Sequence, residues 1–318
     1  MPDVHSITLY IPCHNMAQTL PRAIESVLAQ TRPPDQLLII DDASTDASRD
    51  IIADYRAKHP TLIQPVLLDQ NMGIPVVRSI ALQHTRCDWV TYLDADDTYE
   101  PRKIELETKA LRKHPSAGYA YSNFTITNDQ LDGARRWYTS EPMPAGDLFD
   151  QIVTFGFPGG ILPRCELMNT SIVRSIGSYR ADIGFYEDYD LQFRLARVCA
   201  GAAVAEPTHW YHQHANGVHR APYARHYDGL RRVYTDHAAL ISSLPAPRST
   251  KLQLQTQSTL SRFAWRAVRQ HARGECSLHR RELLRRARAG VAHKPSSVLL
   301  PKNPLRVARG LIRSDAQR

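Results

Sequence analysis

The chain has 318 residues, of which 42% are hydrophobic and 23% are charged, which is ordinary for a soluble globular protein with one large or two modest domains. Its five cysteines are odd in number, widely spaced and form no C-x-x-C pair, so they suggest neither a disulfide framework nor a zinc site, and a reducing, cytosolic compartment is expected. No apolar run approaches the roughly 18 residues that span a bilayer, the first residues lack the features of a signal peptide, and the net charge of +8 leaves an anionic partner open.

Strands and helices are predicted to alternate four times in the first third of the chain. Apolar, β-branched runs indicate the strands, and apolar residues repeated every three or four positions indicate the helices. Thr19 is the expected N-cap of the first helix, with Pro21 in its first turn. Such alternation with short connections implies right-handed βαβ units and a parallel sheet covered on both faces. The predicted strands are residues 6–12, 36–40, 63–68 and 89–93, and the predicted helices are residues 19–30, 47–58, 74–84 and 102–113.

After residue 113 the strict alternation fades. Residues 155–160 are aromatic and rich in glycine, which suits a loop that faces a substrate, and a chain reversal beneath the core explains them as well. Residues 170–176 are typical of a short helix or of the edge of a strand. The remaining predictions are a strand at 118–127, a turn at 128–133, a loop at 137–146, a short helix at 147–153, and helices from 223 to 290 with a linker at 242–249.

Polar clusters follow three of the predicted strands, at residues 12–15, 41–46 and 94–97. Because ligands of open α/β sheets bind beyond the carboxyl ends of the strands, these clusters are expected to meet in one nucleotide-type site. Phosphate loops of the G-x-G-x-x-G and G-x-x-x-x-G-K-[ST] types are missing, which argues against a dinucleotide dehydrogenase or a P-loop enzyme. A different device must therefore hold a diphosphate.

Three carboxylates lie within four residues, at Asp94, Asp96 and Asp97. Crowded carboxylates repel one another unless a cation or donor groups sit among them, and Mg2+ takes one or two carboxylates together with phosphate oxygens. The pattern therefore predicts a metal–diphosphate site. The alternative is an acidic turn that caps the helix starting near Pro101.

Five short motifs occur in order over residues 5–215: residues 11–15 followed by 20–30, residues 39–46, Asn71-Met72-Gly73 with Arg78, a D-x-D at 93–97, and an E-D motif at 187–191. Together they resemble the motifs of the family 2 inverting glycosyltransferases of the GT-A fold. The chain departs from that pattern at three places. His14 replaces a common aromatic residue, Ser79 replaces the usual Asn, and His212 replaces an Arg in a segment similar to the family's later Y-R-x-H.

The resemblance implies an α/β fold in two parts. The first is a GT-A, Rossmann-like catalytic domain at residues 1–220, with a mostly parallel sheet covered by helices, and the second is a basic, helical C-terminal extension at residues 221–318. It also implies transfer of one sugar, with inversion, from a nucleotide-diphospho-sugar, expected to be a UDP-sugar, to a hydroxyl of a glycan or lipid-linked acceptor. Cell-surface polysaccharide or glycolipid synthesis is the expected setting, and Mn2+ or Mg2+ is the expected cofactor.

Asp41 and Asp42 are the expected contacts of the nucleotide. The resemblance places an Asp of this loop against the N–H of the base and the ribose, which suits a carboxylate because it only accepts hydrogen bonds. Pro12 and Asn15 are expected to shape the same pocket through backbone contacts. The alternative is that Asp42 and Ser44 merely cap the following helix, which is worth about 1 kcal/mol.

The expected metal ligand is Asp96, with His214 as a further metal or phosphate contact. Asp94 is expected to face the ribose or a metal-bound water, and Ala95 to line the nucleotide-sugar pocket beside it. The resemblance implies an ion that bridges the two phosphates and neutralises the charge of the departing nucleoside diphosphate. Arg78 is expected to add a fixed positive charge near phosphate or base, and the alternative places it on a solvated helix face.

Asp188 is the predicted general base. An acceptor hydroxyl that attacks the anomeric carbon must lose its proton, and a carboxylate within hydrogen-bond reach accepts it. Attack from the face opposite the leaving group inverts the configuration. Glu187 is expected to contact hydroxyls of the acceptor or donor. The alternative is a solvated, acidic helix start, since Glu187, Asp188 and Asp190 all favour a helix N-terminus.

Charge is divided unevenly along the chain. Residues 220–318 contain 21 Lys and Arg against 5 Asp and Glu, whereas residues 1–219 contain 19 against 27. Arg306, Arg309 and Arg313 line one side of a predicted final helix, which suits an anionic membrane surface, and an amphipathic helix packed on the catalytic domain fits as well. The expected location is cytoplasmic, with a peripheral position on the inner face of the membrane left open.

Two other functions remain open. A sugar nucleotidyltransferase would share the fold, but the glycine-rich, Lys/Arg-bearing loop typical of that class is missing at residues 12–16. A nucleic-acid-binding protein would use the Arg-rich tail, but no RNP, KH or zinc-finger pattern is present. The acidic N-terminal part also argues against a nucleic-acid clamp, so no specific nucleic acid partner is expected.

Overall fold

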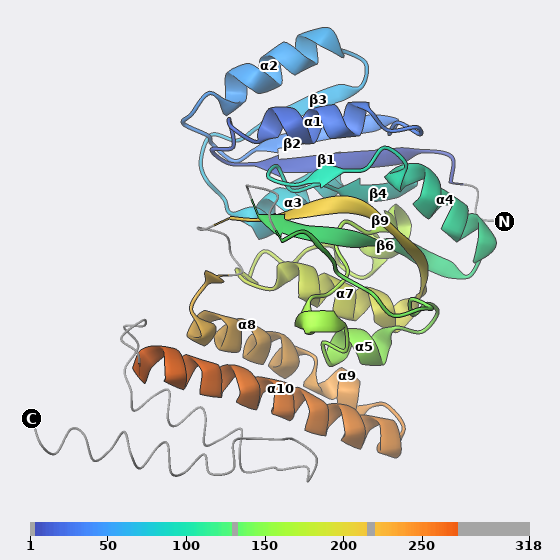
Figure 1. The fold of residues 1–318 in the computed structure, drawn as a ribbon, viewed down its shortest axis with the longest axis vertical. Coiled ribbons are helices and arrows are strands. Elements are labelled where there is room, and N and C mark those ends of the chain that lie inside the picture. Colours follow the sequence, from blue (N-terminus) through green and yellow to red (C-terminus); the bar gives the residue numbers. More distant parts are fainter. Residues whose placement is uncertain (1–3, 129–132, 215–219, 273–318) are drawn as a thin grey trace, which may run out of the picture. The chain divides into compact units, whose positions relative to one another are not determined.

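The computed structural model describes residues 4–128, 133–214 and 220–272 (Figure 1). The chain divides into two compact units, Met1–His219 and Arg220–Arg318. The final helix predicted around residues 305–313, the helix predicted at 273–290 and most of the turn predicted at 128–133 lie outside the described residues. None of the described helices is long and apolar enough to cross a membrane.

One mixed sheet forms the centre of the first unit (Figure 1). Its strands are β1 (Ile7–Cys13), β2 (Gln36–Asp41), β3 (Ile63–Leu67), β4 (Trp89–Tyr92), β5 (Thr98–Tyr99), β6 (Ala117–Asn128), β7 (Arg135–Arg136), β8 (Leu167–Asn169) and β9 (Ala200–Gln213). The order is β3-β2-β1-β4-β8-β6-β9-β5, with β7 paired to β6. The parallel pairing predicted for β1 to β4 is confirmed. Beyond β4 the sheet is mixed, because β8 runs antiparallel to β4 and β6, whereas β6 and β9 are parallel.

The parallel half brings the polar clusters to one edge of the sheet. Every residue of β1 and β2 is buried, which explains their nearly continuous apolar sequences. The register pairs Cys13 with Asp41, and Tyr10 with Tyr92 at the end of β4. The residues that follow these three strands therefore emerge side by side, as expected for a ligand site of an α/β sheet.

The long strand β9 is the main element that the sequence did not indicate. Pro207 interrupts it, and its polar residues and histidines hide the alternation of a strand. Its pairing with β6 shifts in register on both sides of Asn123, which lies opposite Pro207. At its far end, Trp210 pairs with Thr98 of β5, the short strand that directly follows the D-x-D. The end of β9 is thus joined to the acidic turn.

Helices flank the sheet of the first unit. They are α1 (Leu20–Leu28), α2 (Ser48–Lys58), α3 (Ile74–His84), α4 (Lys103–Lys113), α5 (Phe149–Val153), α6 (Thr170–Ser175) and α7 (Glu187–Val198), with a 3-10 turn η1 at Pro158–Gly160. Thr19 is the N-cap of α1, as expected, but its side chain makes no capping hydrogen bond. Residues 170–175 are helical because the side chain of Asn169 accepts a hydrogen bond from the N–H of Ile172 at 3.1 Å.

A buried ion pair fixes α4 to the core. Nζ of Lys103 lies 2.6 Å from Oε2 of Glu107, and both side chains are fully buried. The same Nζ donates to Oγ1 of Thr91 at 3.0 Å and to the carbonyl oxygen of Cys165 at 2.6 Å, and Ser122 donates to Glu107. Buried charges persist only where partners satisfy them, so this cluster holds α4, β4 and the segment before β8 at fixed spacing.

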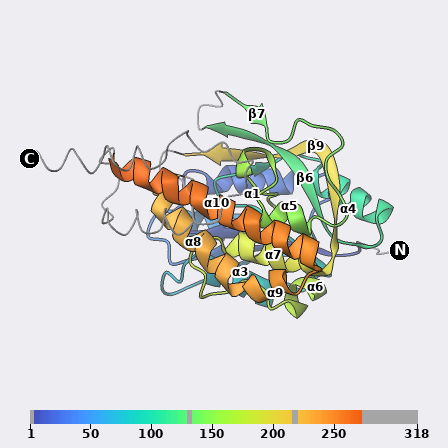
Figure 2. The same ribbon diagram turned by 90° about the horizontal axis from the view of Figure 1, so that it is seen from below.

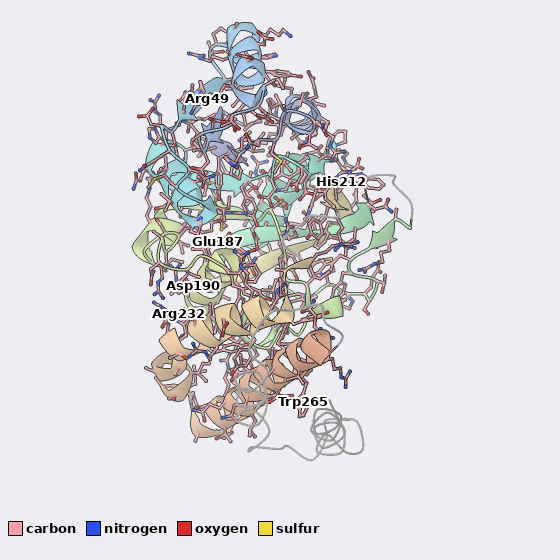
Figure 3. All side chains as sticks on the ribbon, turned by 90° about the vertical axis from the view of Figure 1, so that its left-hand side faces the viewer. Arg49, Glu187, Asp190, His212, Arg232 and Trp265 are labelled. Atoms are coloured by element: carbon pink, nitrogen blue, oxygen red, sulfur yellow. The ribbon has the colours of Figure 1, made fainter. Side chains whose placement is uncertain are left out.

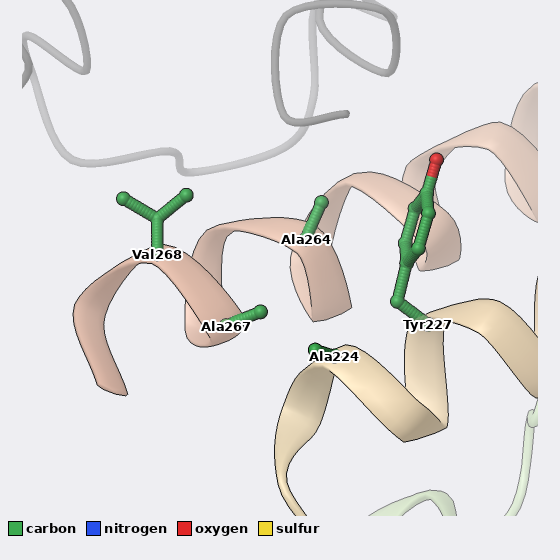
Figure 4. Close-up of a cluster of buried hydrophobic side chains, with 5 residues drawn as sticks. All are labelled: Ala224, Tyr227, Ala264, Ala267 and Val268. Atoms are coloured by element: carbon green, nitrogen blue, oxygen red, sulfur yellow. The ribbon is translucent and has the colours of Figure 1, made fainter. Parts of the chain in front are cut away.

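The second unit, in its described part, consists of α8 (Tyr223–Asp236), α9 (Ala238–Ser242) and α10 (Ala246–Ala272). α8 and α10 lie side by side in two perpendicular views (Figures 1 and 2). The two helices share a cluster of buried residues (Figure 4), made of Ala224, Tyr227, Ala264, Ala267 and Val268. The predicted linker at 242–249 is wrong in extent, because α10 begins at Ala246 with Pro247 in its first turn, where proline is tolerated.

Candidate active site

Asp42 holds the turn that begins α3. Its Oδ1 accepts the N–H of Met72 at 2.7 Å, and its Oδ2 accepts the N–H of Gly73 at 2.9 Å. Gly73 has φ of 80°, a conformation that glycine adopts without strain. Asp42 does not cap α2, whose N-cap is Ala47 with no side-chain bond. The helix-capping alternative for Asp42 is therefore wrong.

Asp41 is fully buried and pairs with Arg49 of α2, which Figure 3 labels. Nε of Arg49 lies 2.6 Å from Oδ2, and the same oxygen accepts the N–H of Ser44 at 3.1 Å. Oδ1 of Asp41 is buried and has no hydrogen-bond partner among the described residues. A buried acceptor without a donor is rare in proteins and marks a place where a ligand N–H or water completes the bonding.

Asn15 joins the loop after β1 to the loop after β2. Its side-chain Oδ1 accepts the N–H of Thr45 at 2.8 Å, and its own N–H donates to Oγ of Ser44 at 2.9 Å. Asn15 has a left-handed backbone, with φ of 54°. Pro12 is buried at the end of β1, just before this loop. The two loops therefore form one continuous surface beyond the sheet.

Asp94 lies between two guanidinium groups, that of buried Arg78 and that of half-buried Arg164. Its Oδ1 is 3.0 Å from Nη2 of Arg78, and its Oδ2 is 2.7 Å from Nη2 of Arg164. Arg78 stacks 4.2 Å above the ring centre of Tyr92, and Arg164 stacks 4.1 Å above that of Tyr211. Arg78 is only 4% exposed, so the alternative of a solvated helix face is wrong. The arginines engage both oxygens of Asp94, an arrangement that the sequence did not indicate.

Asp97 anchors the acidic turn to the end of β9. Its side chain is fully buried, its Oδ1 accepts the N–H of His212 at 2.8 Å, and its Oδ2 lies 3.4 Å from Nη2 of Arg164. Burial raises the pKa of Asp97 well above its usual range, although the positive charge of Arg164 opposes the shift. The N-cap of α4 is Arg102 and receives no side-chain bond, so the turn is not a helix cap and that alternative is wrong.

Asp96 and His214 form a pair of candidate metal ligands. Oδ2 of Asp96 lies 3.5 Å from Nε2 of His214, and Ala95 beside them is buried. The carbonyl oxygen of Asp96 accepts a hydrogen bond from Nη2 of Arg22 at 2.6 Å, which fixes the turn. Burial, and then the charge of Asp94, raise the pKa of Asp96. Within the described ranges no three His, Cys, Asp or Glu side chains group around a metal position, so these residues offer a pair of ligands.

Arg78 extends the network to the E-D motif. Its Nε lies 3.5 Å from Oε1 of Glu187, the first residue of α7, where Figure 3 labels Glu187 and Asp190. Burial, and then the neighbouring Asp188, raise the pKa of Glu187 to about 7, and Arg78 opposes the shift. Asp190 is fully buried and pairs with Arg194 at 2.7 Å. For Glu187 and Asp190 the alternative of a solvated helix start is therefore wrong.

Asp188 is half-buried in the first turn of α7. Its Oδ1 accepts the N–H of Tyr189 at 2.7 Å, and none of the described residues donates a hydrogen bond to its Oδ2. Glu166 is buried nearby and accepts a hydrogen bond from Gln192. Burial raises the pKa of Glu166 to about 7, and the negative charge of Asp188 contributes to the shift. One oxygen of Asp188 is thus fixed by the backbone and the other is available to a ligand.

Two of these residues, Arg164 and Glu166, were not predicted from the sequence. Both lie in an irregular segment between η1 and β8 that matches no motif and no periodic pattern. Cys165 between them has φ of 55°, a left-handed conformation that turns the chain sharply. No local signal in the sequence distinguishes Arg164 from any surface arginine, because its role depends on contacts with distant residues.

An α/β sheet that gathers acids from the loops after β2 and β4 and from the start of α7 defines a nucleotide-diphospho-sugar transferase of the GT-A fold. The sequence profile described as Glycosyl transferase family 2 matches residues 8–169. The chain therefore belongs to glycosyl transferase family 2, a family of inverting glycosyltransferases, and the family resemblance is confirmed. The matched residues contain the first four motifs, and the E-D motif at 187–191 follows them.

Curated relatives agree with this assignment. The succinoglycan biosynthesis protein ExoO of Rhizobium meliloti is 27% identical over 255 residues, which cover 76% of this chain and 68% of ExoO. The putative teichuronic acid biosynthesis glycosyltransferase TuaG of Bacillus subtilis is 29% identical over 120 residues, which cover 38% of this chain and 47% of TuaG. The match thus spans about half the length of that relative.

Two solved structures share the fold at low sequence identity. TarS 1-349 of S. aureus in complex with UDP-GlcNAc has a TM-score of 0.63 and 16% identity, with 90% of this chain and 88% of that chain covered. The mannosyltransferase PcManGT from Pyrobaculum calidifontis in complex with GDP-Man and Mn2+ has a TM-score of 0.54 and 16% identity, with 98% and 79% covered. These similarities confirm the GT-A architecture.

The buried Glu166 predicts a pH-dependent stability. Its pKa is about 7 in the folded chain against 4.5 as the reference value, so the folded state binds a proton that the unfolded state releases, and stability falls as pH rises from about 4.5 to about 7. Glu166→Gln removes the titration, and we expect it to be more stable than the original protein by roughly 1–3 kcal/mol at pH 8 but nearly equal at pH 4.5. Urea unfolding across this pH range measures the difference. Exposed Glu206→Gln is the control, and equal pH profiles for the original protein and Glu166→Gln would contradict the prediction.

Proposed function

We propose that this chain transfers one sugar, with inversion, from a UDP-sugar to a hydroxyl of a glycan or lipid-linked acceptor, in cell-surface polysaccharide or glycolipid synthesis. The observation that supports this most directly is a continuous ionic network of side chains. It runs from Glu187 through Arg78, Asp94 and Arg164 to Asp97. This ionic network joins Glu187 of the E-D motif to the D-x-D, and Glu187 is the residue directly before the candidate base Asp188, which supports one connected site.

Relatives support a nucleotide-sugar donor and a cell-surface product. One structural neighbour binds UDP-GlcNAc and another binds GDP-Man with Mn2+. Two relatives are named for the biosynthesis of succinoglycan and teichuronic acid. In this chain the buried Oδ1 of Asp41 would accept the N–H of the base, beside the surface formed by Asn15 and Pro12.

Buried donors suit the diphosphate. Nη1 of Arg78 and Nε of Arg164 are buried and have no hydrogen-bond partner among the described residues. Guanidinium groups match phosphate oxygens in shape and charge, so these N–H groups would bind the anion that the acids alone would repel. Asp94 keeps both arginines in place while their outer donors stay available.

Asp96 and His214 fit a divalent ion at the same place. Their side-chain atoms lie 3.5 Å apart, close enough for both to contact one ion, and Mg2+ or Mn2+ is commonly held by one or two protein ligands together with phosphate oxygens. When bound, the ion would neutralise negative charge on the departing nucleoside diphosphate. Asp94 and Asp97 are engaged by arginine and backbone groups, so Asp96 is the acid left to bind it.

Residues of the E-D motif supply the proton chemistry. Asp188 would accept the proton of the acceptor hydroxyl on Oδ2, while the N–H of Tyr189 holds Oδ1 and fixes the orientation of the carboxylate. Because the pKa of Glu187 is about 7, its carboxyl group can donate a hydrogen bond to a sugar hydroxyl or accept one from it near neutral pH. Attack from the side opposite the diphosphate then inverts the anomeric centre.

The metal assignment predicts a specific loss of activity in Asp96→Ala. A panel of nucleotide sugars, read by nucleoside-diphosphate release, should show slow hydrolysis of one donor with Mn2+ and none with EDTA. Asp96→Ala should lower that rate by about 100-fold or more, because charge on the leaving group is no longer neutralised. Exposed Asp54→Ala on α2 is the control. Hydrolysis that persists in both Asp96→Ala and EDTA would rule out the metal, and no hydrolysis of any donor would count against the proposed function.

The base assignment predicts separate effects on binding and transfer. Asp188→Asn keeps the shape of the side chain but cannot accept the proton, so transfer should fall by about 100-fold to 10,000-fold. The affinity for the nucleoside diphosphate, measured by calorimetry, should stay close to that of the original protein. Asp54→Asn serves as the matched control. Transfer at the original rate in Asp188→Asn would remove the assignment.

The second unit supports association with an anionic membrane surface. α10 contains no Asp or Glu, and its exposed Lys251, Arg262, Arg266 and Arg269 recur at intervals that place them on one face of the helix. Each basic residue near an anionic surface adds about 1 kcal/mol of binding. On α8, by contrast, Arg232 pairs with Asp236 at 2.8 Å.

Vesicle binding tests this part of the proposal. The full chain should co-sediment with vesicles of phosphatidylcholine and phosphatidylglycerol, but not with phosphatidylcholine alone, at low salt. Replacing Arg262, Arg266 and Arg269 together by Gln should weaken binding by about 100-fold. The matched triple change at Arg225, Arg231 and Arg232 on α8 removes equal charge and should have a smaller effect. Equal loss in both, or tighter binding to duplex DNA than to vesicles, would contradict a membrane role for α10.

A further inference from the structure

Three half-buried aromatic side chains gather where the loop after α5 meets the start of α7. Phe155 follows α5, and Phe185 and Tyr186 directly precede Glu187. The ring centroids of Phe155 and Tyr186 lie 6.1 Å apart and those of Phe185 and Tyr186 lie 4.9 Å apart, each pair at an interplanar angle of 80°. We call these three residues the aromatic cluster, and each of them is partly exposed.

Buried Tyr189 anchors the aromatic cluster to the core. Its ring centroid lies 4.5 Å from that of Phe155 and 6.1 Å from that of Tyr186. Its hydroxyl donates to the carbonyl oxygen of Val153 at 2.9 Å, which ties the end of α5 to the first turn of α7. The outer rings therefore rest on a fixed, buried ring.

Backbone strain sets two rings of the aromatic cluster apart from ordinary packing. Phe155 has φ of 51° and Tyr186 has φ of 72°, in the left-handed region that bulky residues rarely adopt. Such conformations cost about 1–3 kcal/mol each, persist where the surrounding structure holds them and are frequent at active sites. Of the other described non-glycine residues with this kind of backbone, Asn15, Ala43 and Cys165 belong to or adjoin the candidate site, and Ser178 does not.

The aromatic cluster lies beside the candidate base. The carbonyl oxygen of Tyr186 accepts the N–H of Asp190 at 2.9 Å, so Tyr186 belongs to the same turn of backbone as Asp188. Gly156 and Gly184, the sequence neighbours of Phe155 and Phe185, are both exposed. Two rings of the aromatic cluster and the candidate base thus belong to neighbouring residues at the start of α7.

We infer that the aromatic cluster binds the acceptor and that the acceptor is a pyranose residue of a glycan. This inference rests on the proposed function, because it takes Asp188 as the base. One face of a pyranose is rich in C–H groups, which pack against the electron-rich face of an aromatic ring, while its hydroxyls point outward to Asp188 and Glu187. An acyclic polyol has no such face, and a lipid chain gains nothing from acids beside it.

Saturation-transfer NMR on the full chain with bound nucleoside diphosphate tests the inference directly. The probes are the methyl pyranosides of glucose, galactose, N-acetylglucosamine and mannose, with glycerol and ribitol as acyclic polyols. We expect at least one methyl pyranoside to receive saturation at its ring C–H protons, and neither polyol to do so. Saturation of a polyol with no methyl pyranoside would overturn the inference.

Two substitutions distinguish the loss of an aromatic ring from a general disturbance of the fold. Asn tolerates a left-handed backbone, so Tyr186→Asn removes the ring without the strain that another residue would add. Binding of the methyl pyranoside should weaken about tenfold in Tyr186→Asn and in Phe155→Asn, as expected for loss of one stacked ring. Tyr186→Phe keeps the ring and should bind like the original protein, as should Tyr55→Leu, which removes a half-buried ring from α2. Undiminished binding in the double Asn variant would overturn the inference.

A kinetic measurement distinguishes this inference from the proposed function. With the donor that the chain hydrolyses, the ratio of transfer to hydrolysis at fixed methyl pyranoside should fall about tenfold in Tyr186→Asn and be retained in Tyr186→Phe. An unchanged ratio in Tyr186→Asn overturns the aromatic cluster as the acceptor site while donor hydrolysis keeps the proposed function. Pyranoside binding without hydrolysis of any donor would overturn the proposed function instead.

Discussion

The candidate site depends on one carboxylate, Asp94, held between the guanidinium groups of buried Arg78 and half-buried Arg164. Arg78 could not keep its charge out of water without a partner, since an unpaired buried cation is strongly unfavourable. Asp94 meets both at 2.7 to 3.0 Å, and Glu187 and Asp97 balance the outer sides. The first acid of the D-x-D is therefore the centre of the ionic network, and the second, Asp96, is left to meet a ligand.

The parallel half of the fold could be predicted from the sequence because its signals are local. β1 and β2 are buried throughout, so their apolar residues are nearly continuous, and the helices between the strands show clear periodicity. β9 could not be predicted, since Pro207 and several histidines hide it and only pairing with β6 across the bulge at Asn123 makes it a strand. Its stability comes from a partner far away in the sequence.

The acidic residues of the candidate site could be predicted from the sequence, but the residues that surround them could not. Asp42, Asp96 and Asp188 belong to motifs whose order and spacing are visible in the sequence. Burial is what rejects the simpler interpretations of Arg78 and Glu187, and burial depends on the assembled fold. Arg164 has no local pattern at all, because its importance arises only when the chain brings it between Asp94 and Asp97.

The buried cluster around Lys103 and Glu107 connects the candidate site to the interior of the protein. One ammonium group donates both to Thr91, on the strand that leads into the acidic turn, and to the carbonyl oxygen of Cys165, the neighbour of Arg164. Through these two contacts, a residue of α4 helps to set the spacing between Asp94 and Arg164. The same acidic loop placed in another protein without this buried cation would lack that support.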